Sequence, residues 1–340
     1  MRKFPIVYSW VAVAMLSSLA NCMVTNDFEV NCNLGNCDEV SNKQFETSSW
    51  ALDRIDQNST ELDGKYKYQS TGKGVTAYII DGDMQPHKEF SERFVDVVDF
   101  YGEGLDECQN HGTAMASLVG GKDFGVAKKV SLVSVKVAGC QLDQDTGTYG
   151  MIGSPEQMVE GIRWVMENAV RPAVVNISFS EFNPLSRSGE PFSGDTTVYD
   201  ALTELVDSGI VAVVAAGNKG ADACDRSQPR VEGAITVGSV DENDSRSEFS
   251  NFGPCVDIFA PGEDVRVASN VTRDGMSGWV SSNGTSISSA LVTGQVAKIL
   301  EENPGATVQE VKTILYNSSI SGMVSNRKGG ADRILFAPWN

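Results

Sequence analysis

Asn283-Gly284-Thr285-Ser286-Ile287-Ser288-Ser289-Ala290-Leu291-Val292-Thr293-Gly294 is the stretch around which the rest of the sequence can be interpreted. Asn283-Gly284 predicts a turn, and the apolar spacing from Ile287 onward predicts a helix that runs towards Pro304. Ser286 would then lie at the start of that helix, where unpaired backbone N–H groups and the helix dipole can receive an anion. This position is typical of a nucleophile; the alternative is an ordinary Ser/Thr cap.

Length and composition limit the class of protein. The chain has 340 residues, of which 41% are hydrophobic, so it can bury a substantial core, and α/β folds of this size often form one domain. Its formal net charge of -18 argues against a nucleic acid or an anionic membrane surface as a partner. The acidic composition fits a soluble secreted protein.

The N-terminus has the pattern of a secretory signal. Arg2-Lys3 precede an apolar run over residues 4–16 and then small residues, so residues 1–20 are predicted to be a signal peptide cleaved near Ala20. The alternative is an uncleaved anchor, for which the run is short. We expect no membrane attachment after cleavage. Secretion makes the seven cysteines disulfide candidates: Cys22, Cys32, Cys37, Cys108, Cys140, Cys224 and Cys255.

Residues 21–46 are polar and acidic, and fewer than about 40 residues seldom fold alone. They are therefore predicted to form a short leader or N-terminal arm. The catalytic domain is predicted to span residues 47–340.

Residues 75–80, Val-Thr-Ala-Tyr-Ile-Ile, form an apolar run that Asp81-Gly82-Asp83 closes. The run predicts a buried parallel strand with carboxylates at its carboxyl end, the edge at which open α/β sheets bind their ligands. A structural Asp-Gly turn is the alternative.

A second helix is predicted to begin at a histidine, in the stretch from Asn110-His111-Gly112 to Gly121. The whole chain has two histidines. His87 lies in a charged loop and is interpreted as structural or solvated. His111 is therefore the only plausible imidazole base for a nucleophile.

Further apolar runs predict strands over residues 130–137, 173–179, 210–216, 234–240 and 256–259. Capping boxes predict helices that begin after Ser154, with Gln157, and after Thr307, with Glu310. Because strands and helices alternate, the fold class is predicted to be α/β, with a mostly parallel central sheet and helices on both faces.

With Asp81, His111 and Ser286 in this order and in these contexts, the sequence resembles the subtilase (subtilisin-like serine protease) family, and within it the proteinase K branch. The resemblance covers about residues 48–340 and includes four further motifs: residues 50–55 (WALDRI), 213–218 (VVAAGN), 249–253 (FSNFG) and 257–262 (DIFAPG). The order differs from that of α/β-hydrolases, which ends in histidine. The resemblance implies a subtilisin-like three-layer fold.

The resemblance also implies a secreted serine endopeptidase with Asp81, His111 and Ser286 as the catalytic triad. The oxyanion hole would be formed by the side-chain amide of Asn218 and the backbone N–H of Ser286. The partners of the enzyme would be protein or peptide substrates. The chain would act as a monomer, and the chemistry would require no cofactor.

Two segments resemble the walls of the family's substrate channel, where a peptide would bind by adding a strand. Gly153 and Ser154 match one wall, and Ser178, Phe179 and Ser180 match the other. Relatives usually have Ser-Leu-Gly-Gly at the second wall, so Ser180 and Glu181 add side chains there. This departure motivates an alternative function, a catalytically inactive homologue that binds a peptide or protein in the cleft.

The resemblance implies two disulfides, Cys108–Cys140 and Cys224–Cys255. It also implies a structural Ca²⁺ ion held by Asp257 and by carbonyls near Glu232 and Ala234, although Asp257 could equally be an ordinary surface carboxylate. Four of six Asn-x-Ser/Thr sequons are expected to be available to glycans, whereas those at Asn176 and Asn283 are interpreted as chance matches; the four are at Asn58, Asn243, Asn270 and Asn317.

Overall fold

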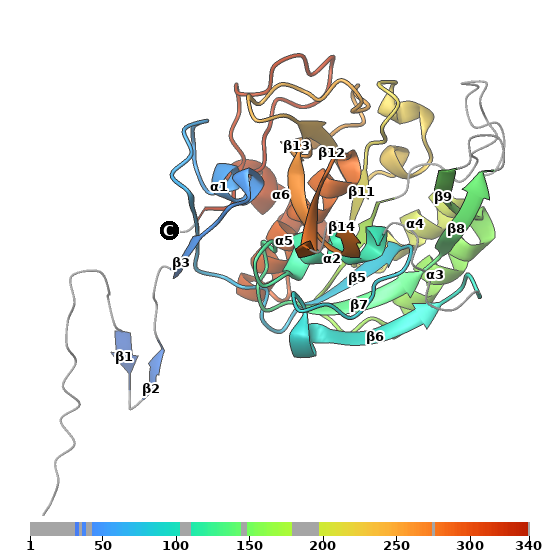
Figure 1. The fold of residues 1–340 in the computed structure, drawn as a ribbon, viewed down its shortest axis with the longest axis horizontal. Helices are drawn as coiled ribbons and strands as arrows, with labels where there is room; N and C mark the ends of the chain where they lie inside the picture. Colours follow the sequence, from blue (N-terminus) through green and yellow to red (C-terminus); the bar gives the residue numbers. More distant parts are fainter. Residues whose placement is uncertain are drawn as a thin grey trace, which may run out of the picture. The chain divides into compact units, whose positions relative to one another are not determined.

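The computed structural model describes residues 31–33, 36–38, 43–102, 110–143, 148–178, 197–273 and 276–338 (Figure 1). The chain divides into two units, Met1–Ser41 and Asn42–Asn340. In the first, β1 (Asn31–Asn33) pairs antiparallel with β2 (Asn36–Asp38). The second includes β3 (Lys43–Glu46), which pairs antiparallel with β4 (Lys65–Tyr68).

The larger unit is built on a seven-stranded sheet with the strand order β13-β12-β11-β10-β5-β7-β6, in which every neighbouring pair is parallel. Layers on both faces bury the inner strands, which explains why they read as near-continuous apolar runs. The strands are β5 (Thr76–Asp81), β6 (Phe94–Asp99), β7 (Ser131–Lys136), β10 (Ala173–Ile177), β11 (Val211–Ala215), β12 (Ile235–Val240) and β13 (Ile258–Pro261).

Helices form the two outer layers of this three-layer α/β fold (Figure 1). α2 (His111–Gly120) packs against α5 (Thr285–Glu302), and both contact the sheet. α3 (Pro155–Asn168) packs against α4 (Thr197–Asp207) and contacts the sheet elsewhere. The other described elements are α1 (Trp50–Ile55), α6 (Val308–Ser318), short 3-10 turns at Ser91–Arg93, Ala223–Asp225 and Gln228–Arg230, and the antiparallel hairpins β8–β9 (Ala138–Asp143, Thr148–Gly153) and β14–β15 (Val265–Arg273, Met276–Ser282).

α5 is the central helix of the molecule, since every residue from Thr285 to Leu300 is buried. Small residues allow this close packing: a Cβ added at Gly294 would lie 2.9 Å from the carbonyl oxygen of Val119 in α2. A helix enclosed on all sides needs no polar face, so this buried stretch is apolar or small apart from Gln295 and Lys298. Residues 285–294 therefore belong to the core as well as to the candidate site.

Both predicted capping boxes are confirmed. The hydroxyl of Ser154 accepts a hydrogen bond from Gln157 N (3.2 Å), and Ser154 N donates to the Gln157 side chain (2.8 Å). Thr307 and Glu310 make the same reciprocal pair at the start of α6. These contacts satisfy N–H groups that a helix start leaves unpaired, so α3 and α6 begin where the sequence placed them.

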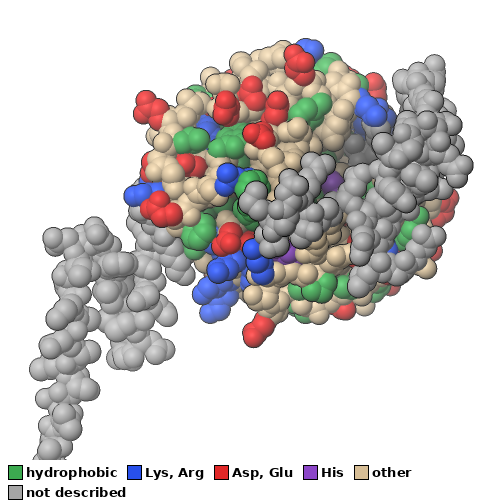
Figure 2. Space-filling model, viewed as in Figure 1, with side chains coloured by type: hydrophobic (Ala, Val, Ile, Leu, Met, Phe, Trp, Pro, Cys, Tyr) green, Lys and Arg blue, Asp and Glu red, His purple; other side chains and the backbone are tan. Residues whose placement is uncertain are grey.

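Acidic side chains are scattered over the face shown in Figure 2, with lysine and arginine between them. This distribution matches the formal net charge of -18. Among the described residues, none of the helices combines the length and apolar character that spanning a bilayer requires.

Candidate active site

The three residues predicted to form a triad all lie at the carboxyl edge of the central sheet. Asp81 is the last residue of β5, His111 is the first residue of α2, and Ser286 is the second residue of α5. The start of α5 is held at this edge by backbone hydrogen bonds, since Gly284 N donates to Gly262 O (2.8 Å), just after the end of β13. α2 packs against α5, and both helices begin at this edge of the sheet. Residues that are far apart in the sequence are therefore placed at the same edge.

Asp81 and His111 form a buried hydrogen-bonded pair. His111 Nδ1 lies 2.7 Å from Asp81 Oδ1, and Gly82 N donates to the same oxygen at 2.7 Å. Asp81 is fully buried, and its second oxygen, Oδ2, has no hydrogen-bond partner among the described residues. Burial alone would lower the pKa of His111, but the charge and hydrogen bond of Asp81 outweigh burial and raise that pKa above its ordinary value.

The local sequence explains how His111 reaches Asp81. Asn110, the residue before α2, has a left-handed backbone (φ 49°), which turns the chain into the helix. Thr113 N donates to Asp83 O (3.2 Å), and a Cβ added at Gly112 would lie only 2.5 Å from that oxygen. The glycine after the histidine therefore lets the first turn of α2 pack directly on the loop that follows Asp81.

Ser286 and Asn218 face one small space beside Gly284. A Cβ added at Gly284 would lie 2.8 Å from Ser286 Oγ, 3.6 Å from Asn218 Nδ2 and 3.7 Å from Ser286 N. The hydroxyl and the two predicted oxyanion donors thus surround a single point, which only glycine leaves open. This geometry suits an oxyanion that forms next to the serine hydroxyl.

The amide of Asn218 is oriented by Thr285. Asn218 Oδ1 accepts hydrogen bonds from Thr285 N and Thr285 Oγ1, both at 2.9 Å. The Thr285 hydroxyl itself accepts from Gly217 N (3.1 Å), so its position is fixed from both sides. With the oxygen engaged in this way, the donor nitrogen of the amide is directed to the Ser286 side.

Asn251, a fully buried residue of the FSNFG motif, holds the loop that carries Asn218. Its Oδ1 accepts from Lys219 N and Ala221 N, both at 3.0 Å, and its Nδ2 donates to Ala216 O (2.8 Å). The FSNFG motif is part of the predicted family resemblance, but no role was predicted for Asn251 or Thr285. Their signal was a polar residue in an otherwise buried motif, which indicates a buried hydrogen-bond network.

The predicted channel walls are described in part. Gly153 ends β9, and a Cβ added there would lie 2.7 Å from Val137 O, so this wall requires glycine. At the other wall, Ser178 Oγ accepts a hydrogen bond from the side chain of Asn176, which is fully buried (2.7 Å). The predicted wall residues Phe179 and Ser180 lie outside the described residues.

One predicted disulfide is present. Cys224 is bonded to Cys255, which joins the segment after the Asn218 loop to the segment before Asp257. The predicted Cys108–Cys140 pairing lies outside the described residues, since Cys108 is not among them.

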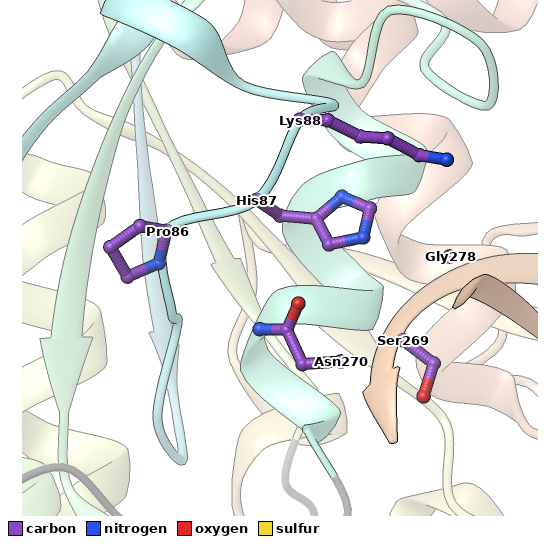
Figure 3. A pocket seen from close by; sticks show the side chains of 6 residues that line it. All are labelled: Pro86, His87, Lys88, Ser269, Asn270 and Gly278. Carbon is purple, nitrogen blue, oxygen red and sulfur yellow. The ribbon is translucent and has the colours of Figure 1, made fainter. Parts of the chain in front are cut away.

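The second histidine lies in a different environment. Figure 3 shows His87 with Pro86 and Lys88 at one side of a cavity of about 230 Å³, across from Ser269, Asn270 and Gly278. His87 Nδ1 accepts a hydrogen bond from Glu89 N (3.2 Å), within its own loop. Burial, and then the charge of Lys88, lower the pKa of His87. These contacts agree with the structural interpretation of this residue.

The site thus defines a class, an α/β protein with an Asp-His pair and a helix-start serine at one sheet edge. Residues 52–335 match the family described as "Subtilase family", and the chain belongs to that family. It is similar to a solved structure titled "Crystal structure of a cold adapted subtilisin-like serine proteinase", with a TM-score of 0.75 and 35% sequence identity. That match covers 86% of this chain and 99% of the other.

Three named relatives show the same family likeness. The chain is 38% identical over 291 residues to alkaline serine exoprotease A of Vibrio alginolyticus, and 36% identical over 296 residues to an extracellular serine proteinase of a Thermus species. It is 33% identical to a cuticle-degrading serine protease of the fungus Arthrobotrys oligospora. The matches cover 85%, 86% and 85% of this chain, but only 50%, 67% and 68% of the respective relatives.

Proposed function

We propose that the chain is a secreted serine endopeptidase that hydrolyses peptide bonds through an acyl-enzyme. The observation that carries this proposal is the hydrogen-bonded Asp81–His111 pair at the sheet edge where Ser286 Oγ and Asn218 Nδ2 face one space. Family membership supports the same reaction, since the named relatives are serine proteases.

In this reaction the Ser286 hydroxyl attacks the substrate carbonyl and His111 Nε2 takes the hydroxyl proton. Asp81 accepts a hydrogen bond from Nδ1, which fixes the tautomer that leaves Nε2 free as a base. The carboxylate also stabilises the imidazolium that forms, and His111 then gives the proton to the leaving amine. Water then attacks the acyl-enzyme, with His111 again acting as the base. The Ser286 oxygen leaves and takes the proton from His111, which releases the new carboxyl terminus.

Negative charge that develops on the carbonyl oxygen is received by Asn218 Nδ2 and Ser286 N. These donors need no rearrangement during the reaction, because Thr285 already holds the amide of Asn218. All reacting groups come from the chain itself, so no cofactor enters the chemistry.

Substrates would be proteins or peptides bound as an added strand between Gly153 and Ser178. The signal pattern of residues 1–20 and the extracellular proteinase among the relatives support secretion. A single chain supplies every group in the mechanism, which supports action as a monomer.

A serine-directed phosphonate with a peptide recognition group tests the proposal. The purified protein should be labelled at Ser286, as located by mass spectrometry of its peptides, and Ser286→Ala should take up no label. Ser289→Ala is the matched control, since Ser289 is a buried serine one turn further along α5. Labelling of the native protein and of this control, together with cleavage of casein, would support the endopeptidase.

The opposite outcome is equally clear. If the native chain is folded by circular dichroism but neither reacts with the phosphonate nor cleaves casein, the proposal is wrong. The catalytically inactive homologue that binds a peptide in the cleft would then replace it.

A further inference from the structure

We propose that the ammonium group of Lys312 takes the structural place of a calcium ion beside Asp257, so that this region is held together without metal. The family resemblance implied oxygen ligands from Asp257 and from carbonyls near Glu232 and Ala234. The contacts around these residues identify a cation that belongs to the chain. This proposal concerns folding and does not depend on the proposed function.

Lys312 reaches the predicted ligands from α6. Lys312 Nζ donates a hydrogen bond to the carbonyl oxygen of Ala234 (2.9 Å), one of the two backbone oxygens implied as metal ligands. α6 buries Val308, Val311 and Leu315, an i, i+3, i+7 stripe, so the stem of Lys312 beside it can extend along the apolar surface to the carbonyl.

The carboxylate of Asp257 is also faced by the chain's own positive charges. Burial raises the pKa of Asp257, and the charge of Lys312, a hydrogen bond from Thr236 N and the charge of Arg333 oppose that rise. Thr236 N lies 2.9 Å from Asp257 Oδ2. Burial raises the pKa of Tyr316, and the negative charge of the nearby Asp257 raises it further. The charges of Lys312 and Arg333 and the N–H of Thr236 therefore already stabilise the Asp257 carboxylate.

This donor set does not fit calcium. Ca²⁺ requires about six to eight oxygen ligands at about 2.3–2.6 Å. A calcium ion on the Ala234 carbonyl would share that oxygen with an ammonium group and would be repelled by it. Among the residues that the structure describes, Asp257 belongs to no group of three or more His, Cys, Asp or Glu side chains that could hold a metal.

The ammonium group performs a connection that a metal would otherwise perform. Ala234 directly precedes β12, Asp257 directly precedes β13, and Lys312 belongs to a helix that packs against α5. The Lys312 side chain thus joins α6 to the residue before β12 by a hydrogen bond, and its charge acts on the carboxylate before β13. Because the amine is covalently attached, chelators cannot remove it.

Thermal unfolding of the full chain tests the proposal, with Ser286→Ala in every sample to prevent self-digestion. Any calcium-induced rise in the unfolding temperature should be the same, within about 1 °C, in the native Lys312 background and in its Asp257→Asn variant. Lys312→Ala should lower that temperature in EDTA by roughly 2–6 °C. Calcium should restore a large part of this loss, because the shorter side chain frees the Ala234 carbonyl and makes room for the ion.

Two further variants locate the effect. Lys312→Met keeps the stem and removes the charge, so it should be destabilised but should gain no response to calcium. In Lys312→Ala, the added change Asp257→Asn should abolish the calcium response. A response of the Lys312 wild-type chain that survives Asp257→Asn would also agree with the proposal, because it would place metal at another site.

The proposal is overturned if calcium raises the unfolding temperature of the Lys312 chain and Asp257→Asn removes that effect. It is equally overturned if Lys312→Ala unfolds at the same temperature as the Lys312 chain and gains no calcium response.

Discussion

Two buried aspartates, Asp244 and Asp81, are partnered in opposite ways. Asp244 accepts from both ends of the Arg54 guanidinium, with Nε to Oδ1 at 3.0 Å and Nη2 to Oδ2 at 2.7 Å. Asp81 uses Oδ1 twice, for His111 and Gly82, while Oδ2 has no described partner. Buried polar atoms are normally paired, so the unpaired oxygen of Asp81 distinguishes the candidate active site from the Asp244 region, where both carboxylate oxygens are paired.

The Asp244 region shows what complete pairing achieves. Arg54 belongs to α1, which has six residues and is too short to be stable by itself. Its guanidinium also donates from Nη1 to Gln57 O (2.9 Å). The side chains of Arg54 and Asp244 are each about 1% exposed. The pair therefore fixes an early helix to a loop nearly two hundred residues away. At the candidate active site, by contrast, a single carboxylate oxygen of Asp81 contacts one imidazole and one backbone N–H.

Asp81→Asn should produce the largest effect on either side of this comparison. We expect kcat to fall by about 10,000-fold, because an amide can stabilise the wrong imidazole tautomer, with little change in unfolding free energy. The two influences that raise the pKa of His111 both come from Asp81, so only burial, which lowers it, would remain. Since the base must be neutral, activity rises with pH through this pKa. The acidic limb of kcat/KM against pH should therefore move to lower pH in the variant.

The same measurement can refute the comparison. If Asp81→Asn retains near-native kcat, or if its acidic limb moves to higher pH, the Asp81 charge does not control the imidazole. Asp83→Asn is a suitable control, because it changes a second buried carboxylate two residues further along the chain, whose Oδ2 accepts a hydrogen bond from Gln85 Nε2 (3.1 Å).

Arg54→Met should show the reverse pattern. Removing one partner of a buried ion pair leaves Asp244 charged and unpaired, which we expect to lower the unfolding free energy by about 3–5 kcal/mol. The kcat of the protein that remains folded should stay within about twofold of native. Urea unfolding and active-site titration measure the two quantities separately.

A double variant sharpens this result. Arg54→Met with Asp244→Asn removes both charges, so its loss should be smaller than the sum of the single losses. Additive losses would mean that the two side chains do not act as a pair, and the contrast with Asp81 would fail.

The sequence predicted the inner strands well and the exposed ones poorly. Six apolar runs became β5, β7, β10, β11, β12 and β13, because burial on both faces gives an uninterrupted apolar pattern. β6 (Phe94–Asp99) was not predicted. It is one of the two edge strands and none of its residues is buried. Val95 and Val97 are exposed like Asp96 and Asp99, so its sequence resembles a loop as much as a strand.

The candidate active-site residues could be predicted from the sequence because each belongs to a short motif with a particular residue type. Long-range side-chain contacts could not be predicted. Thr285 contacts Asn218 across 67 positions, and Lys312 contacts Ala234 across 78, so only the folded chain reveals these pairs. No periodicity or local spacing encodes a hydrogen bond between distant segments.

Thr285 lies between the two extremes, since it is as buried and as fully paired as Asp244 but belongs to the catalytic edge. Thr285→Val keeps its shape and removes the hydroxyl. Asn218 Oδ1 would keep Thr285 N, so the amide would be loosened but not released, and we expect kcat to fall by roughly 10-fold with KM unchanged. This loss is smaller than the roughly 100-fold or more for removal of an oxyanion donor, a range established on subtilisin, a member of this family.

Thr285→Ser restores the hydroxyl and should restore most of kcat, which separates positioning of Asn218 from packing of the methyl group. The decisive measurement is a double-mutant cycle with Asn218→Ala. If Thr285 acts through the amide, Thr285→Val should have almost no further effect on kcat once that amide is gone. A full 10-fold loss in the Asn218→Ala background would show that Thr285 supports the fold, as Asp244 does, and that complete pairing at the catalytic edge has no separate role in rate.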